Sequence, residues 1–104
     1  MIRVQIELWM DLSEELAGDF EAPSATRSLK SVDAEEGATV RDVFVALARR
    51  YQVLADRVLD PDQGVFNPNV VVLYNGRVIP RHGVEDRLLC EGDRITVLPV
   101  YAGG

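Results

Sequence analysis

A single amphipathic segment, residues 40–51, most constrains the fold of this 104-residue chain. Its apolar residues recur at helical spacing on one face: Val40, Val43, Phe44, Leu47, Ala48 and Tyr51. Thr39 is suited to cap this helix, Asp42 stands at the third helical position, and the last turn is basic. Because a lone long helix among strands must cover one face of a sheet, the sequence predicts an α+β fold.

Alternation and apolar runs predict the strands. Residues 1–8 alternate with period two, residues 27–34 form a weaker strand, and residues 70–74 form a continuous apolar run, as in a central strand. Asn75-Gly76 predicts a hairpin turn into a short return strand at residues 77–79. The last strand is expected at residues 94–98, with regular pairing weakening at Pro99, which has no N–H.

The remaining segments carry weaker signals. A short helix is expected over residues 11–18, because Asp11 can cap it and Gly18 can end it, and a loop over residues 18–26. A further helical turn is expected at residues 54–59, ended by residues 60–64.

The element order predicts the β-grasp arrangement, with four to five strands in a mixed sheet and the helix on one face. The first two strands form a hairpin, the helix crosses over, and the last strand lies mid-sheet, parallel to the first. The chain is expected to be one domain, residues 1–104, with residues 99–104 as an extended tail.

Charge and composition argue against several classes. The net charge is −6, and residues 1–40 hold nine acidic and three basic residues, so a nucleic-acid partner is not expected. No apolar run is long enough for a membrane span, so no membrane partner is expected. One cysteine, Cys90, suits a reducing cytoplasm.

Catalytic and metal sites are not expected either. His82 is the one histidine, so a triad or a Cys-His pair has a single candidate base with nothing to place it. His82 and Cys90 together are too few ligands for zinc. The stretch DPDQG at residues 60–64 resembles the start of a calcium loop, but Val71 stands where the glutamate is needed.

Three stretches carry a family resemblance: EEGATVRDVFVALARRY, VVVLYNG and EGDRITVLPVYAGG, which ends the given sequence on Gly-Gly. With their order and the predicted fold, the chain resembles the ubiquitin-like sulfur carriers of the MoaD/ThiS family from Met1 to Gly104. Its connection over residues 9–26 is long for that family, and Tyr101 stands where family tails carry a smaller residue. The chain length favours the branch of the molybdopterin synthase small subunit.

The resemblance implies a carrier that brings no catalytic side chains and no bound cofactor. An E1-like activating enzyme of the MoeB/ThiF type would consume ATP to adenylate the carboxylate of Gly104. A sulfur donor would then form a thiocarboxylate, for use by a large synthase subunit or another sulfur acceptor. A tail without Cβ atoms suits a narrow channel, so Gly103, with Ala102 and Tyr101, would thread it while Pro99 holds its direction.

A partner surface is also expected. If Ile95 and Val97 face the helix, then strand alternation turns Leu98 to the other face of the sheet, where Val71 and Leu73 join it. Such an apolar patch, formed by Val71, Leu73 and Leu98, often marks a docking site. Scattered surface residues, or burial under residues 54–66, are the alternatives.

Other functional classes stay open at this point. The chain is alternatively a protein modifier joined through Gly104, with Lys30 as its one lysine, or a sulfur donor for thiamine, cysteine or tRNA thiolation. A β-grasp binding module with an inert tail is the third class.

Overall fold

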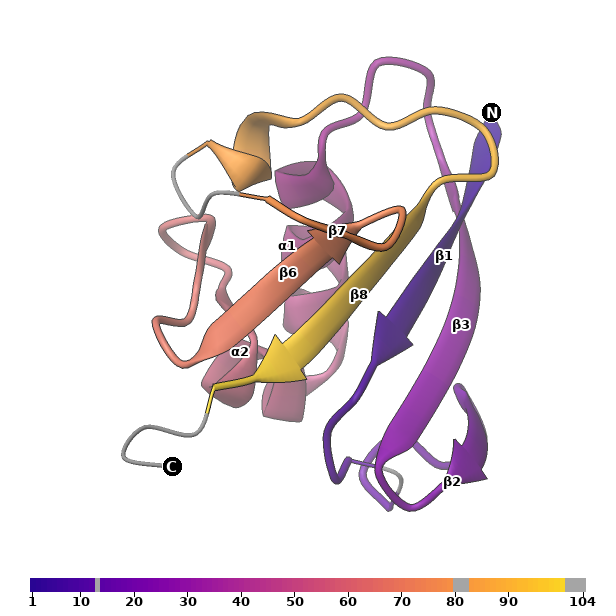
Figure 1. Ribbon diagram of the computed structural model, residues 1–104, viewed down its shortest axis with the longest axis vertical. Helices are drawn as coiled ribbons and strands as arrows, with labels where there is room; N and C mark the ends of the chain where they lie inside the picture. Colours follow the sequence, from indigo (N-terminus) through magenta and orange to yellow (C-terminus); the bar gives the residue numbers. More distant parts are fainter. Residues whose placement is uncertain (13, 80–82, 101–104) are drawn as a thin grey trace.

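The computed structural model describes residues 1–12, 14–79 and 83–100. Within them, a mixed sheet has its strands in the order β2-β3-β1-β8-β6-β7 and carries helices α1 and α2 on one face (Figure 1). The sheet strands are β1 (Ile2–Leu8), β2 (Glu21–Ser24), β3 (Arg27–Ala34), β6 (Val70–Tyr74), β7 (Arg77–Val78) and β8 (Arg94–Pro99). The other elements are α1 (Val40–Arg50), α2 (Gln52–Arg57), the 3-10 helix η1 (Val84–Asp86) and a small sheet of β4 (Leu59–Asp60) and β5 (Val65–Phe66).

The strand directions confirm the predicted β-grasp fold. β1 pairs antiparallel with β3 and parallel with β8, and β8 pairs antiparallel with β6, so the last strand lies in the middle of the sheet. The described residues form a six-stranded main sheet, rather than one of four to five strands, because β2 was not predicted.

Helix α1 lies over the core as its apolar stripe predicts. Val40, Phe44 and Leu47 are buried against the inner residues of the sheet, and Tyr51 follows as the C-cap. Thr39 and Asp42 form a complete capping box: the Thr39 hydroxyl accepts from the backbone N–H of Asp42, and the Asp42 carboxylate accepts from that of Thr39. The helical turn predicted at residues 54–59 is confirmed for residues 54–57, which belong to α2, whereas Leu59 begins β4.

The helix expected over residues 11–18 is wrong for its described residues, which form turns. Leu12 and Leu16 are buried, and the Leu16 N–H donates to the Leu12 carbonyl at 3.1 Å, but this helical turn does not propagate. Extending so short a helix brings too few hydrogen bonds to offset nucleation. The segment instead folds back so that Phe20 joins the core.

Three short strands stand where the sequence predicted loop or turn. β2 lies within residues 18–26, and all four of its side chains are exposed, so no apolar alternation marks it. β4 and β5 are two residues each and flank the predicted break at residues 60–64. Strands this short owe their pairing to the surrounding packing rather than to a readable pattern.

At Pro99 the pairing of β8 differs on its two sides: Pro99 is in register with Val70 of β6, whereas the register with β1 ends at Val97. The expected weakening at Pro99 is therefore confirmed on the β1 side and wrong on the β6 side. The carbonyl of Val97 accepts from the N–H of Trp9, so the odd-numbered residues of β8 turn their backbone polar groups toward β1. β1 has ended at Leu8, so the absent N–H of Pro99 coincides with the end of the pairing between β1 and β8.

Candidate functional site

The C-terminal end of β8 is where the predicted tail leaves the sheet. The N–H of Val100 donates to the carbonyl of Asn69 at 2.8 Å, just before β6 begins, so the chain stays attached to the sheet one residue past β8. The predicted tail residues Tyr101, Ala102, Gly103 and Gly104 lie outside the described residues. The exit is thus fixed between a mid-sheet strand and the loop before β6.

The three predicted patch residues come together on the sheet face opposite the helices. Val71 is the register partner of Leu98, and Leu73 lies two residues along the same strand. All three side chains are half-buried, whereas Val70 and Val72 are buried in the core, as strand alternation requires. We call Val71, Leu73 and Leu98 the sheet-face patch.

Two exposed apolar residues adjoin the sheet-face patch and were not part of the sequence prediction. Val78 is the register partner of Leu73 and is 70% exposed. Trp9 follows β1, bonds to the Val97 carbonyl through its N–H, and is 44% exposed. The sequence carries no signal that these two residues lie on the face of the sheet-face patch, because their position depends on the order of the strands in the sheet. Together these residues widen the apolar surface beside the tail exit.

A buried carboxylate lies on this same face of the sheet. Glu7 is 7% exposed and is the register partner of Thr96 on β8. Its Oε1 accepts from the Arg27 Nη2 at 2.5 Å and from the Trp9 indole N–H, and the guanidinium of Arg27 lies 5.2 Å from the centre of the Trp9 ring. Burial acts to raise the pKa of Glu7, but the bonds from Trp9 and Arg27 outweigh it, so the pKa lies below its ordinary value.

A second carboxylate holds the two turns at the other end of β6 and β8. Asp93 accepts from the Tyr74 hydroxyl, from the Asn75 amide at 3.0 Å and from the backbone N–H of Cys90 at 2.7 Å. Burial and the neighbouring Asp93 raise the pKa of Tyr74 to about 12. Tyr74 therefore stays protonated and donating at neutral pH, and this cluster is a structural latch.

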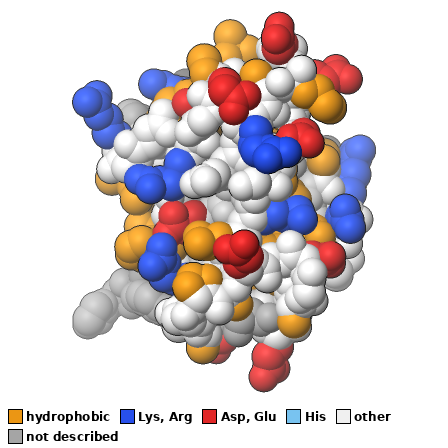
Figure 2. Space-filling model, turned by 90° about the vertical axis from the view of Figure 1, so that its right-hand side faces the viewer, with side chains coloured by type: hydrophobic (Ala, Val, Ile, Leu, Met, Phe, Trp, Pro, Cys, Tyr) orange, Lys and Arg blue, Asp and Glu red, His pale blue; other side chains and the backbone are white. Residues whose placement is uncertain are grey.

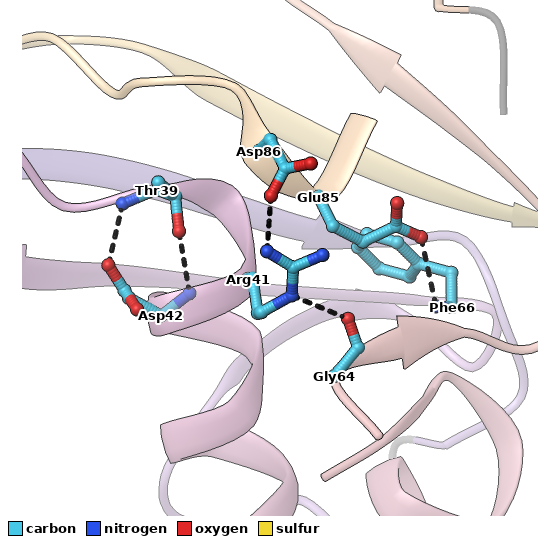
Figure 3. Close-up of polar contacts among 7 residues, drawn as sticks. All are labelled: Thr39, Arg41, Asp42, Gly64, Phe66, Glu85 and Asp86. Atoms are coloured by element: carbon cyan, nitrogen blue, oxygen red, sulfur yellow. Dashed lines mark hydrogen bonds and ion pairs between the residues drawn. The ribbon is translucent and has the colours of Figure 1, made fainter. Parts of the chain in front are cut away.

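A third polar cluster joins the small β4-β5 sheet to α1 and η1 (Figure 3). Arg41 on α1 donates through Nε to the carbonyl of Gly64 at 2.9 Å and forms an ion pair with Asp86. The buried carboxylate of Glu85 accepts from the N–H of Phe66 at 3.2 Å. These bonds fix the connection between α2 and β6. The last residue of this connection is Asn69, which accepts the hydrogen bond from Val100.

Metal ligands do not gather in the described part of the chain. Over residues 1–12, 14–79 and 83–100, no three His, Cys, Asp or Glu side chains lie together as metal ligands. Cys90 is exposed, but it precedes β8 and so lies at the opposite end of that strand from Pro99. His82 lies outside the described residues. Among the described helices, none has the length and apolar character that crossing a membrane requires.

Comparison with known proteins places this geometry in a family. The profile of the ThiS family matches residues 21–104, which include all of β8 and the last two glycines. The chain belongs to the ThiS family. Small archaeal modifier protein 3 of Haloferax volcanii is 37% identical over 70 residues, which make up 67% of this chain and 74% of that protein.

Solved structures agree with the fold of this ThiS-family chain. The crystal structure of SAMP1 from Haloferax volcanii is 27% identical, with a TM-score of 0.67 and coverage of 98% of this chain and 99% of the other. Urm1 from Trypanosoma brucei is 16% identical, with a TM-score of 0.69 and coverage of 98% and 95%, and shows the fold alone. The chain is thus one of the ubiquitin-like sulfur carriers and modifiers.

Proposed function

We propose that this chain carries sulfur as a thiocarboxylate on Gly104, as the small subunit of a molybdopterin synthase. Its partners are an E1-like activating enzyme of the MoeB/ThiF type and the large synthase subunit that accepts the sulfur. The chain itself supplies an acyl group rather than catalytic side chains, and it works in the cytoplasm.

The proposed reaction needs only the Gly104 carboxylate, ATP and a sulfur donor, and it uses no side chain from the described part of the chain. A carboxylate oxygen of Gly104 attacks the α-phosphorus of ATP and pyrophosphate leaves, which makes an acyl-adenylate. A hydrosulfide equivalent from the donor then attacks the acyl carbon, and AMP departs to leave the thiocarboxylate. The carboxylate is ionised at neutral pH, because an α-carboxyl group has a pKa of about 3.5. The activating enzyme must exclude water, which would otherwise hydrolyse the adenylate.

The observation that carries the proposal is the exit of the chain from β8. Hydrogen bonding on both sides holds the strand in the middle of the sheet, and the bond from Val100 to Asn69 extends this hold by one residue. A tail anchored at Val100 loses less freedom on entering a channel, so more of the binding energy remains for the reaction. Gly103 and Gly104 then give the slim backbone that a channel needs.

The sheet-face patch is the proposed contact for the activating enzyme. It adjoins the tail exit, because Leu98 directly precedes Pro99 and pairs with Val71. An enzyme that covers this apolar surface would bring the tail to its nucleotide without the helices taking part. The ion pair of Glu7 and Arg27 lies beside the patch, where its charges would favour one orientation of a bound partner.

Intact-mass measurement tests the proposal directly. The purified chain is incubated with activating enzyme, ATP and sulfide, and the mass gain that replaces one oxygen by sulfur is expected at the C-terminus. A variant without Gly103 and Gly104 is the control and should gain nothing. An unchanged mass in the full chain, with an enzyme that thiocarboxylates its usual carrier, would overturn the carrier proposal and leave a binding module.

A second candidate is a protein modifier conjugated through Gly104, and the similarity to small archaeal modifier protein 3 favours it. Lys30 is the one lysine of the chain, so side-chain polymers have a single attachment position. Its ammonium group donates to the carbonyl of Asp19 at 3.1 Å. Covalent adducts in cell extract supplied with ATP would identify a modifier. Other acceptors, in thiamine, cysteine or tRNA thiolation, would take the same thiocarboxylate.

A further inference from the structure

We propose that the free edge of β3, with the groove between β3 and α1, binds an extended segment of a partner protein. The segment adds to the sheet as an antiparallel strand next to β3. It begins with basic residues, has apolar residues in its middle and ends with acidic residues. This surface lies along the edge of the sheet, apart from the sheet-face patch and the tail.

The direction of the backbone groups on β3 follows from the hydrogen bonds of β1. The carbonyl of Arg3 accepts from Gly92, and the N–H of Gln5 donates to Asp93, so these two residues of β1 turn their backbone groups away from β3. The even-numbered residues of β1 therefore bond to β3, and their register partners include Lys30, Val32 and Ala34. The residues between those partners, Ser31 and Asp33, turn their N–H and C=O groups outward.

The outward groups of Ser31 and Asp33 are available for pairing. β2 covers only the start of β3, where its register partners are Arg27 and Leu29. Within the described part of the chain, no backbone hydrogen bond of Ser31 or Asp33 is found on that outer side. An uncovered strand edge of this kind is a template for an additional strand, which gains affinity through main-chain hydrogen bonds.

A groove along the same edge can take the side chains of the added strand. Two adjoining hollows of ≈ 390 and ≈ 320 Å³ lie between β3 and α1 and share Asp33, Val43 and Ala46 in their walls. Val32 and Leu47 complete the apolar lining of the second hollow. Alternate side chains of an added strand would point toward α1, and apolar ones fit this lining.

The charges at the two ends of the groove determine which end of an antiparallel occupant is basic. Glu35, Glu36 and Asp42 line the hollow at the C-terminal end of β3, whereas Lys30 and Arg50 line the other. Figure 2 faces this side of the molecule and shows acidic side chains gathered at its upper end, with basic and acidic ones together across its middle. An antiparallel strand that starts basic and ends acidic meets opposite charge at both ends.

A second copy of the chain fits this site less well than a flexible segment. The side chains of β3 that point toward the helices are already packed against the α1 of their own copy, as the burial of Ala34 shows. They cannot enter the groove of a neighbour. A stable dimer buries about 800 Å² per partner, and two outward residues offer far less edge than that.

Titration with a synthetic peptide tests the proposal. The probe has two lysines at its amino end, alternating isoleucine and threonine in its middle, and two glutamates at its carboxyl end. NMR is expected to show saturable shifts in Ser31, Asp33 and Ala46, with slower amide exchange at Ser31 and Asp33. A peptide with the charged ends exchanged should bind about tenfold more weakly. Ala46→Tyr fills the groove and should weaken binding about tenfold, whereas Ala25→Tyr, in the exposed turn after β2, should not.

Several results would overturn the proposal. No saturable shift, equal affinity for both peptides, or shifts confined to the sheet-face patch would each contradict it. Protection of Ser31 and Asp33 that rises with protein concentration in the absence of peptide would make a second copy the occupant. Folding of Ala46→Tyr is checked by its NMR spectrum, and the peptide comparison on the unmodified chain decides the question if that variant unfolds. None of these readouts involves Gly104 or ATP.

Discussion

Val100 donates its backbone N–H to the carbonyl of Asn69 at 2.8 Å, one residue beyond the end of β8. β1 has ended by this point, so β6 and the loop before it are what hold β8 here. The last described residue of the chain is therefore fixed on one side only. The predicted tail starts from this bond.

Val100→Pro removes the N–H that makes this bond and leaves the carbonyl of Asn69 without its partner. We expect the rate of thiocarboxylation to fall about fivefold, because a looser exit costs more entropy to order in the channel. Intact mass against time measures the rate. Ala25→Pro is the matched control: it places a proline in the exposed turn after β2, away from the exit, and it should leave the rate unchanged. Equal rates for Val100→Pro and the unmodified chain would contradict a role for the bond.

Leu73→Glu tests the sheet-face patch. Leu73 is half-buried between the register partners Thr96 and Val78, on the face without helices, so a carboxylate there is tolerated by the fold. It would place a charge at the centre of the proposed contact, and adenylation is expected to fall about tenfold or more. ATP–pyrophosphate exchange with the activating enzyme is the measurement.

Leu88→Glu is the control for that experiment, because Leu88 is 61% exposed and lies near the start of α1. It introduces the same charge by the same substitution, and adenylation should stay at the level of the unmodified chain. If both variants are adenylated normally, the sheet-face patch is not the contact. Circular dichroism of each variant shows whether the fold is intact.

The sequence predicts those elements of the fold in which apolar residues recur regularly on one buried face. The stripe from Val40 to Tyr51 and the alternation of β1 follow from one buried face, so they can be read from the residues alone. β2 could not be read, because its four side chains are all exposed and its pairing depends on β3. The turns at residues 11–18 show the converse, since Leu12 and Leu16 have helical spacing but are buried by folding back.

The candidate site also has a part that the sequence predicts and a part that it does not. The sheet-face patch follows from alternation on two strands, whereas its neighbours Val78 and Trp9 depend on which strands lie side by side. The ion pair between Glu7 and Arg27 joins residues twenty positions apart, and neither has a local signal. Glu7 lies in a regular polar position of β1, and only the sheet reveals that this position is buried.

Glu7 is expected to make stability depend on pH. Its pKa in the folded chain lies below the ordinary value of 4.5, so the folded state favours the ionised form. The stability gained is present above about pH 4.5 and is lost as the pH falls through the folded pKa. Glu7→Gln should therefore flatten the decline in the free energy of unfolding below pH 4.5.

Urea unfolding at a series of pH values measures this decline. Arg27→Met gives a second test, because it removes the guanidinium that stabilises the ionised Glu7 and should also weaken the dependence on pH. If Glu7→Gln declines as steeply as the unmodified chain below pH 4.5, other carboxylates are responsible.

Comparing alanine variants of Gly64 and Gly37 distinguishes the cost of backbone strain from the cost of a lost side-chain contact. Both have positive φ, +66° and +88°, so alanine at either position costs about 1–2 kcal/mol of stability. A Cβ on Gly37 meets nothing within 4 Å, whereas one on Gly64 lies 2.8 Å from the Cδ of Arg41. Arg41 would have to move and give up its bond to the Gly64 carbonyl and its pair with Asp86. Gly64→Ala is therefore expected to lower the free energy of unfolding by about 1 kcal/mol more than Gly37→Ala, in urea unfolding of both variants. Equal losses would mean that Arg41 contributes nothing to holding β4 and β5 against α1, and that these short strands depend on the packing of Leu59 and Phe66 alone.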